Sequence, residues 1–153
     1  EAHETMYRQQ DLNTINMQEF LTHLVSQIQG SFIGNNKTLH TEIEDIGVPL
    51  KEGLFIGLIT SELVENAFIH STPQNENGVE IKVLFEKDPD QAERLRLEIA
   101  DNGASISESE ITKNPGLGME LVRVMTEQIN GSIIWETNER NGGVRAVLEI
   151  TSV

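Results

Sequence analysis

Apolar residues recur at helical spacing in three stretches of the chain. The first covers residues 20–28, the second 50–70 and the third 117–129. Residues that favour helix ends follow the first and third stretches: Gly30 and Asn130. The pattern therefore predicts three amphipathic helices.

Apolar and polar residues alternate in several segments between these helices. Such alternation is typical of half-buried strands. Four segments show it: 39–43, 79–85, 95–99 and 144–150. A further strand is expected at 132–136, before the last of these, so that five strands are predicted. The second and third follow each other along the chain, which favours an antiparallel pair. The fourth and fifth flank a glycine-containing turn, which favours a terminal hairpin. We expect Gly47 and Pro49 to interrupt the extended structure after the first strand.

The order α-β-α-β-β-α-β-β predicts an α/β fold. We expect a two-layer α/β sandwich, with a mixed, mostly antiparallel sheet and the helices on one face. The chain has 153 residues, which suits a single domain. No internal repeat or low-complexity tract interrupts it.

The net charge is −14, because the chain has 25 Asp and Glu residues and only 11 Lys and Arg residues. Such a chain repels the phosphate backbone, which argues against general nucleic-acid binding. Direct contact with an anionic membrane surface is disfavoured for the same reason. A polyanionic small ligand is compatible with this charge only where backbone N–H groups, a metal or local cations offset the field.

The chain contains no cysteine, so disulfides, thiolate metal sites and cysteine nucleophiles are excluded. No apolar run is long enough to span a membrane, and no signal peptide is visible. Because the chain begins with Glu1, we expect it to be a piece of something longer.

The second predicted helix carries the first candidate site segment, SELVENAFIH at residues 61–70. Glu62 and Asn66 are four residues apart and therefore share one helix face. An amide oxygen beside a carboxylate suits Mg²⁺. The alternative is an ordinary solvated helix edge.

Two further segments follow at the end of a strand and the beginning of a helix. Asp101-Asn102-Gly103 ends the third strand, where a carboxylate could accept a hydrogen bond from a ligand amine; the alternative is a plain turn. Residues 114–119, NPGLGM, place two glycines at a helix start, where free N–H groups and the helix dipole favour an anion. The alternative is a loose first turn. A P-loop motif is absent.

Together, in this order and on these elements, the three segments resemble the N box and the two glycine boxes of the GHKL ATP-binding superfamily. The likeness is greatest to the catalytic domains of sensor histidine kinases of the HisKA_2/HWE type, whose N box reads close to N-E-L-x-x-N-A-x-K-H. Residues 3–7 and the ending at 142–150 also resemble that family.

The resemblance implies a Bergerat fold that binds ATP and Mg²⁺ beneath a short lid at residues 104–115. Asp101 would accept from the adenine amino group, and Gly103 would line the base pocket. Asn66 would bind Mg²⁺, while Glu62 would polarise water or help to orient the metal. The remaining ligand-binding positions implied are the backbone at Gly116, Leu117 and Gly118, the lid cation Lys113, and His70 at the end of the N box.

Three positions depart from the family pattern. Ser61 replaces the first N-box Asn, Ile69 replaces the N-box Lys, and Ser105 replaces the second Gly of D-x-G-x-G. These departures are compatible with adenine binding. Ile69 removes a cation from the phosphate region and Ser105 bears on the shape of the first glycine-box turn, so both bear on phosphoryl transfer.

The resemblance implies a protein-histidine kinase module that donates the γ-phosphoryl group of ATP to a His on an adjoining dimerisation domain. That His would serve a response-regulator Asp. We expect residues 1–18 to be the end of the dimerisation region and 19–153 a cytoplasmic ATP-binding domain. The full-length protein would be a homodimer, and whether it is attached to a membrane stays open. The phosphoacceptor lies outside this chain, since its own histidines (His3, His23, His40 and His70) lack the acceptor context.

Two other readings stay open. A degenerate ATP-binding domain would act as a docking or phosphotransfer module with little kinase turnover, as Ile69 and Ser105 suggest. An anti-sigma-type Ser/Thr kinase shares the same three boxes, although the segment at residues 3–7 argues against it.

Overall fold

The computed structural model describes residues 13–32, 36–91, 93–104, 116–137 and 142–151. In chain order the elements are β1 (Thr14–Asn16), α2 (Met17–Gly30), β2 (Lys37–Ile43), β3 (Gly47–Pro49), α3 (Leu50–His70), β4 (Val79–Lys87), β5 (Arg94–Asp101), α5 (Gly116–Gln128), β6 (Gly131–Thr137) and β7 (Val144–Thr151). The three predicted helices and five predicted strands are all confirmed.

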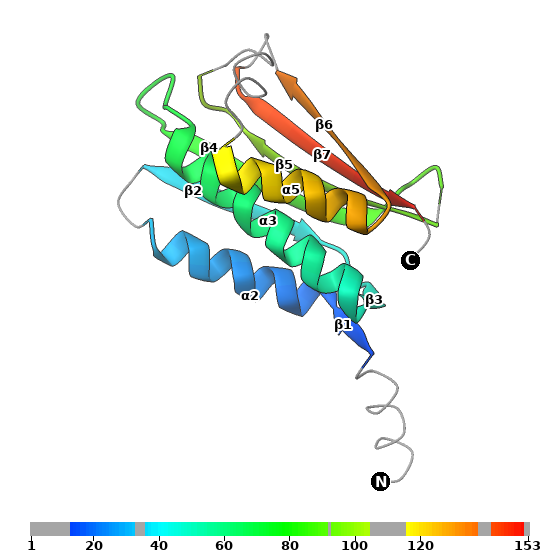
Figure 1. Ribbon diagram of the computed structural model, residues 1–153. Helices are drawn as coiled ribbons and strands as arrows, with labels where there is room; N and C mark the ends of the chain where they lie inside the picture. The colour runs from blue at the N-terminus through cyan, green and yellow to red at the C-terminus, as the bar shows by residue number, and fades with distance from the viewer. Residues whose placement is uncertain (1–12, 33–35, 92, 105–115, 138–141, 152–153) are drawn as a thin grey trace, which may run out of the picture.

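Five strands form one sheet in the order β2-β4-β5-β7-β6, and the three helices cover one of its faces (Figure 1). β2 and β4 pair in parallel because α3 carries the chain back across the sheet between them. The other three pairings are antiparallel, including the two that the alternation predicts. The two-layer α/β sandwich with a mostly antiparallel sheet is therefore confirmed.

Two short strands lie outside the prediction. β1 pairs with β3 in an antiparallel ladder of three residues on each side, centred on Ile15 and Val48. The predicted break at Gly47 and Pro49 is thus itself a strand. Alternation over three residues is too short to recognise, so this ladder depends on contacts that only the folded chain provides.

α2 begins earlier than its apolar spacing alone predicts. The Asn16 side chain accepts from the Glu19 N–H at 3.0 Å, which caps the helix. Met17 then becomes the first helical residue and is fully buried. Residues 14–18 therefore pack with the rest of the fold, while the domain boundary expected at residue 18 stays a prediction.

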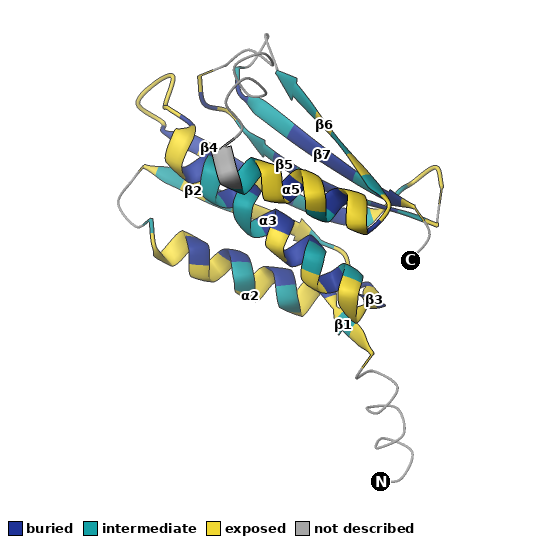
Figure 2. Ribbon diagram, viewed as in Figure 1, coloured by how far each residue is buried: buried dark blue, intermediate teal, exposed yellow. Residues whose placement is uncertain are grey.

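The core fills the space between the helices and the sheet (Figure 2). α3 is buried on several sides, because it contacts α2, α5 and the sheet. Its buried Thr60 satisfies its hydroxyl by donating to the Ile56 carbonyl at 2.7 Å. Near the end of α3, the buried Phe68 ring stacks on Phe32, with ring centroids 4.9 Å apart.

Across the described residues, we find no helix with the length and apolar character that crossing a membrane requires.

Candidate functional site

Those predicted site residues that the structure describes lie toward one end of the molecule, where β5 and α3 end and α5 begins (Figure 1). α3 contacts both β5 and α5, so it links the strand end to the beginning of the second helix. Long-range packing therefore brings together residues as far apart in the sequence as Glu62 and Gly118.

Asp101, the last residue of β5, faces the helix layer. It lies opposite the buried Ile81 of β4, and directly paired residues project from the same face of a sheet. The Gly103 N–H donates to Asp101 Oδ1 at 2.9 Å. Burial raises the pKa of the Asp101 carboxyl above its ordinary value, while the N–H groups of Gly103 and Val144 and the charge of Lys37 oppose that rise. The result is a partly desolvated carboxyl held in a fixed orientation.

The turn after Asp101 is tied to the loop that follows α3. The Ala104 N–H donates to the Thr72 carbonyl at 2.8 Å. The Gln74 amide donates to the carbonyls of Asn102 and Gly103 at 2.9 and 2.8 Å. A Cβ on Gly103 would lie only 2.9 Å from the Thr72 carbonyl oxygen. The fold therefore requires glycine at position 103 whatever ligand lies there.

A glycine pair before β7 closes on the same turn. Gly142 and Gly143 have φ values of +75° and +92°, in the region where side chains are strained. A Cβ on Gly143 would overlap the Asp101 carbonyl oxygen, and one on Gly142 would overlap the Gln74 amide. Three loops thus hold the end of β5 in place.

Glu62 and Asn66 share one face of α3, as predicted, and both contact the first turn of α5. Asn66 Nδ2 lies 3.1 Å from Met119 Sδ, to which it donates. The Glu62 carboxylate lies against Gly118, so that a Cβ there would overlap Glu62 Oε2 and lie 3.2 Å from the carboxyl carbon. The two polar side chains of the N box therefore meet the second glycine box directly.

α5 begins at Gly116, so Gly116, Leu117 and Gly118 form its first turn as the sequence predicts. The first N–H groups of a helix have no partner within it and carry the positive end of the dipole. Backbone groups in this turn can therefore bind an anion. Lys113 and Ser105 lie outside the described residues.

The end of the N box is exposed. Ile69 is 57% exposed, and His70 is the exposed last residue of α3. Ser61 is half-buried one residue before Glu62. The structure therefore places Ile69 and His70 at the surface of the same end of α3, beyond the buried Phe68.

The donor set fits Mg²⁺ held jointly with a phosphate ligand. Among the described residues, no three His, Asp or Glu side chains gather into a metal site. The Asn66 nitrogen is engaged with Met119, which leaves the amide oxygen as the atom able to ligate a cation. One amide oxygen and the neighbouring Glu62 carboxylate, completed by phosphate and water oxygens, match the preferences of Mg²⁺.

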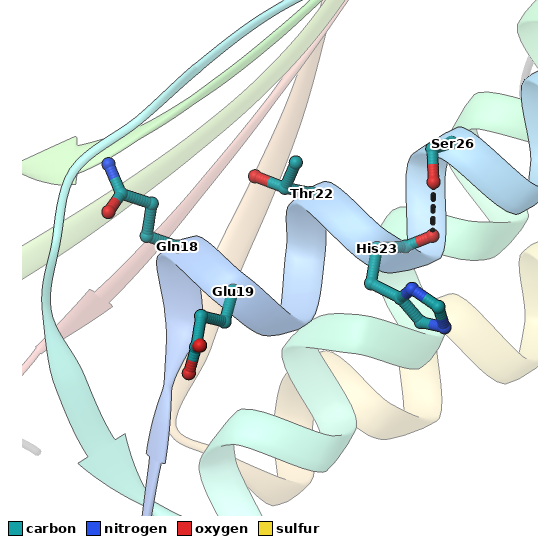
Figure 3. A pocket seen from close by; sticks show the side chains of 5 residues that line it. All are labelled: Gln18, Glu19, Thr22, His23 and Ser26. Atoms are coloured by element: carbon teal, nitrogen blue, oxygen red, sulfur yellow. Dashed lines mark hydrogen bonds between the residues drawn. The ribbon is translucent and has the colours of Figure 1, made fainter.

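A separate hollow lies along the exposed side of α2 (Figure 3). Its lining residues are Gln18, Glu19, Thr22, His23 and Ser26. All five belong to one helix, and the bond drawn between them joins Ser26 Oγ to the His23 carbonyl at 2.8 Å. Because α3, β5 and the beginning of α5 contribute nothing to this hollow, we assign it no function.

Three side chains that contact the site were not predicted from the sequence. Lys37, Gln74 and Met119 reach it from β2, from the loop after α3 and from α5. Each lies 28 or more residues from the partner that it contacts. The motif boxes were recognisable as short local patterns, whereas these contacts depend on tertiary structure.

Residues 51–152 match the family described as histidine kinase-, DNA gyrase B-, and HSP90-like ATPase. The match covers more than half of the chain and includes every predicted site residue.

Two curated relatives are sensor kinases. The chain is 33% identical over 92 residues to sensor histidine kinase CitA of Klebsiella pneumoniae, a stretch that is 52% of this chain and 16% of that protein. It is 27% identical over 113 residues to blue-light-activated histidine kinase 2 of Erythrobacter litoralis, covering 73% of this chain and 31% of that protein. The chain therefore spans less than a third of the length of either relative.

Solved structures of histidine kinase domains share the fold. The histidine kinase domain of an Erythrobacter litoralis blue-light-activated kinase superposes with a TM-score of 0.78 at 19% identity, over 89% of this chain and 65% of that one. The catalytic domain of histidine kinase ThkA gives a TM-score of 0.70 at 24% identity, over 91% and 94%.

Proposed function

Since this chain belongs to the histidine kinase-, DNA gyrase B-, and HSP90-like ATPase family, we propose that it is the ATP- and Mg²⁺-binding catalytic domain of a two-component sensor histidine kinase. One observation carries the proposal. Glu62 and Asn66 lie against the first turn of α5, in the same end of the fold as Asp101. Groups suited to a divalent cation and phosphates therefore contact one another, and a group suited to an adenine amine lies at the same end of the fold.

In this proposal the residues of the site have the following roles. Asp101 accepts a hydrogen bond from the adenine amino group, and Gly103 lets the base approach the backbone. The first N–H groups of α5, from Gly116 to Gly118, bind phosphate oxygens. Asn66 holds Mg²⁺, with Glu62 polarising water or orienting the metal. Bound Mg²⁺ would neutralise charge on the phosphates.

The reaction that we propose is phosphoryl transfer to histidine. The bond between the γ-phosphorus and its bridging oxygen breaks, a bond forms to an imidazole nitrogen, the imidazole loses a proton and ADP leaves. The acceptor His belongs to an adjoining dimerisation domain of a homodimeric protein. It later passes the group to an Asp of a response regulator. Lys113, in the lid, and His70, at the end of α3, would contact the nucleotide.

A second function is favoured by the side chain of Ile69. This apolar residue is 57% exposed, at the position where the resembled family carries a lysine. Without that cation, the domain would bind nucleotide yet transfer its phosphoryl group slowly, and would serve mainly for docking or phosphotransfer.

Nucleotide binding tests the proposed site. A non-hydrolysable ATP analogue at about 100 times its Kd would add about 2.7 kcal/mol to the free energy of unfolding and raise Tm by roughly 5–10 °C. We expect this shift to require Mg²⁺ and to disappear in Asp101→Asn. Asp90→Asn, the same exchange on the exposed loop before β5, should leave the shift unchanged. No shift with any adenine nucleotide would refute the proposal.

Transfer to a supplied dimerisation domain separates the two functions. Radiolabelled ATP should give a product that acid hydrolyses and alkali does not, as expected of phosphohistidine. If the missing cation limits the reaction, Ile69→Lys should raise the rate. A fast reaction that Ile69→Lys does not accelerate would argue against the docking function. An acid-stable, alkali-labile product would instead indicate a Ser/Thr kinase.

A further inference from the structure

Lys37 opens β2, at the edge of the sheet, and its side chain turns toward the helices. It is paired with the buried Val79 of β4, so both side chains project from the helix-covered face. The Lys37 residue is half-buried, and its ammonium donates to the Phe68 carbonyl in the last turn of α3. The last carbonyls of a helix have no partner within it and carry the negative end of the dipole, so a cation is favoured there.

Asp101 lies on this same face and at this same end of the sheet. β4 separates β2 from β5, and the two register pairs, Lys37 with Val79 and Ile81 with Asp101, are only two residues apart along β4. The charge of Lys37 acts on the Asp101 carboxyl, whose pKa it lowers against the larger effect of burial. One ammonium group thus bonds to the end of the N-box helix and acts through its charge on the carboxyl at the end of β5.

The charged residues of the neighbouring strands point the other way. Glu80 and Lys82 flank Ile81 in β4, and both are exposed. Arg145 of β7 is paired with Ala100 of β5. Lys82 lies 3.9 Å from Glu42, and Arg145 bonds Glu98 at 2.9 Å on the outer face of the sheet. These cations are therefore separated from Asp101 by the sheet itself.

The helix and loop that pack near Asp101 carry few titratable groups. They are the half-buried Glu62 and Glu65, the exposed His70 at the end of α3, and the exposed Glu76 in the loop that follows. In the part of the chain that the structure describes, Lys37 is the charged side chain identified as acting on Asp101.

We propose that Lys37 is a positioning residue for nucleotide recognition, holding Asp101 as a hydrogen-bond acceptor and fastening the N-box helix to the adenine end of the site. This inference rests on the proposed function, since it assigns a task to Lys37 within that site.

The chemistry of the adenine contact explains why the charge matters. Asp101 Oδ1 already accepts the Gly103 N–H. A neutral carboxyl would carry its proton on the other oxygen and would present a donor to the adenine amine, which is itself a donor. Burial favours that unproductive form, and a cation nearby opposes it. Lys37 therefore extends nucleotide binding to lower pH.

The test measures the Kd of ADP, which binds without transfer, between about pH 4.5 and 8, a range that begins near the ordinary aspartate pKa. Lys37→Gln removes the charge but keeps an amide donor, and Lys37→Arg keeps the charge. Lys82→Gln removes a lysine from the opposite face as the matched control. We expect Lys37→Gln to move the pH at which ADP affinity falls to a higher value. Near that pH its affinity should be about three- to tenfold below wild type, as expected for one partly screened charge.

Lys37→Arg and Lys82→Gln should follow the wild-type pH profile. An unmoved profile in Lys37→Gln would overturn the proposal. So would uniform weakening at every pH, because it indicates a purely structural role. Lys37→Met, which keeps the apolar stem, replaces Lys37→Gln if that variant does not fold.

Failure of the proposed function would look different. In that case wild-type protein would not bind ADP at any pH, or Asp101→Asn would bind as well as wild type. The carboxyl carbon resonance of Asp101 in the free protein provides an independent readout. Its titration should shift to higher pH in Lys37→Gln, and an unchanged titration would refute the electrostatic role without reference to nucleotide.

Discussion

The Asp101 carboxyl lowers the free energy of unfolding when it is ionised, although its position suits hydrogen bonding to the proposed ligand. Its partial burial raises the pKa of the carboxyl, although the Gly103 and Val144 N–H groups and Lys37 oppose the shift. Between the ordinary and the raised pKa, the folded state binds more protons than the unfolded state. The free energy of unfolding therefore falls as pH rises through this window, and levels off above the raised pKa.

Asp101→Asn should abolish this dependence. We expect the free energy of unfolding of the variant, minus that of wild type, to increase as pH rises from about 4 to 7, so that the variant becomes relatively more stable. Urea denaturation at several pH values measures this difference, in which the effects of the other carboxylates cancel. Asp90→Asn, on an exposed loop, should follow wild type throughout. A difference that shrinks with rising pH would contradict the assigned direction.

Gly143→Ala should be among the most damaging single substitutions in the chain. Gly143 has a φ of +92°, and a Cβ would overlap the Asp101 carbonyl oxygen. The backbone strain alone costs about 1–2 kcal/mol, and the overlap adds to it. We therefore expect at least about 2 kcal/mol of destabilisation by urea denaturation. Gly30→Ala, where a Cβ would meet nothing within 4 Å, should change stability little and is the matched control. Equal effects would show that the contact at Gly143 relaxes freely.

The places of the candidate site residues in the fold were largely predictable, because motifs concentrate these residues in short segments. Glu62 and Asn66 share a helix face as their spacing requires, and Asp101 ends a strand as alternation indicates. Lys37 was not predictable. It is 31 residues from the carbonyl that it binds, and nothing in its local sequence distinguishes it from a surface lysine on an edge strand.

Among the elements, α3 and α5 meet at a contact that has no room for a side chain. The Glu62 carboxylate occupies the space beside Gly118. Gly118→Ala should displace this carboxylate, whose end is flexible, at a cost below about 1 kcal/mol, since alanine also favours the helix. We expect ADP affinity in Mg²⁺ to fall about three- to tenfold, comparable to the loss of one hydrogen bond, because the displaced Glu62 carboxylate no longer helps to orient the metal. Adenosine affinity should not change.

Calorimetric titration with ADP and with adenosine tests this expectation, with Gly30→Ala as the control for a helical glycine exchange. If adenosine and ADP weaken equally in Gly118→Ala, the contact between Glu62 and α5 supports the whole fold and not the phosphate end of the site.

The helices and long strands followed from periodicity, because each buries one face along most of its length. β1 and β3 did not, since three residues carry too little pattern. The neighbours of each strand were only partly predictable. Adjacent strands in sequence, β4–β5 and β6–β7, pair as hairpins predict. β5 and β7 pair although α5 and β6 lie between them in the sequence, so this pairing does not follow from chain order.

The charge of the whole molecule opposes its proposed ligand. The chain carries a net charge of −14, and arginines 94, 96 and 145 of the outer sheet face are engaged with glutamates. We expect ATP affinity without Mg²⁺ to rise when salt increases from about 20 to 150 mM, which shortens the screening length to about 8 Å. Adenosine, which carries no phosphate, should bind equally at both. ATP affinity that falls with salt would show that local cations dominate the site.

The small ladder between β1 and β3 determines where anything preceding residue 13 joins the fold. It holds the chain beside the first residue of α3, where the Leu50 N–H donates to the Asn13 carbonyl at 3.0 Å. α3 has 21 residues, a length of about 30 Å, and the candidate site lies at its far end. The β1–β3 ladder and the candidate site therefore lie at opposite ends of α3. If the site binds a nucleotide as we propose, a small rotation of the domain about this ladder would move the nucleotide through a much longer path than the ladder itself.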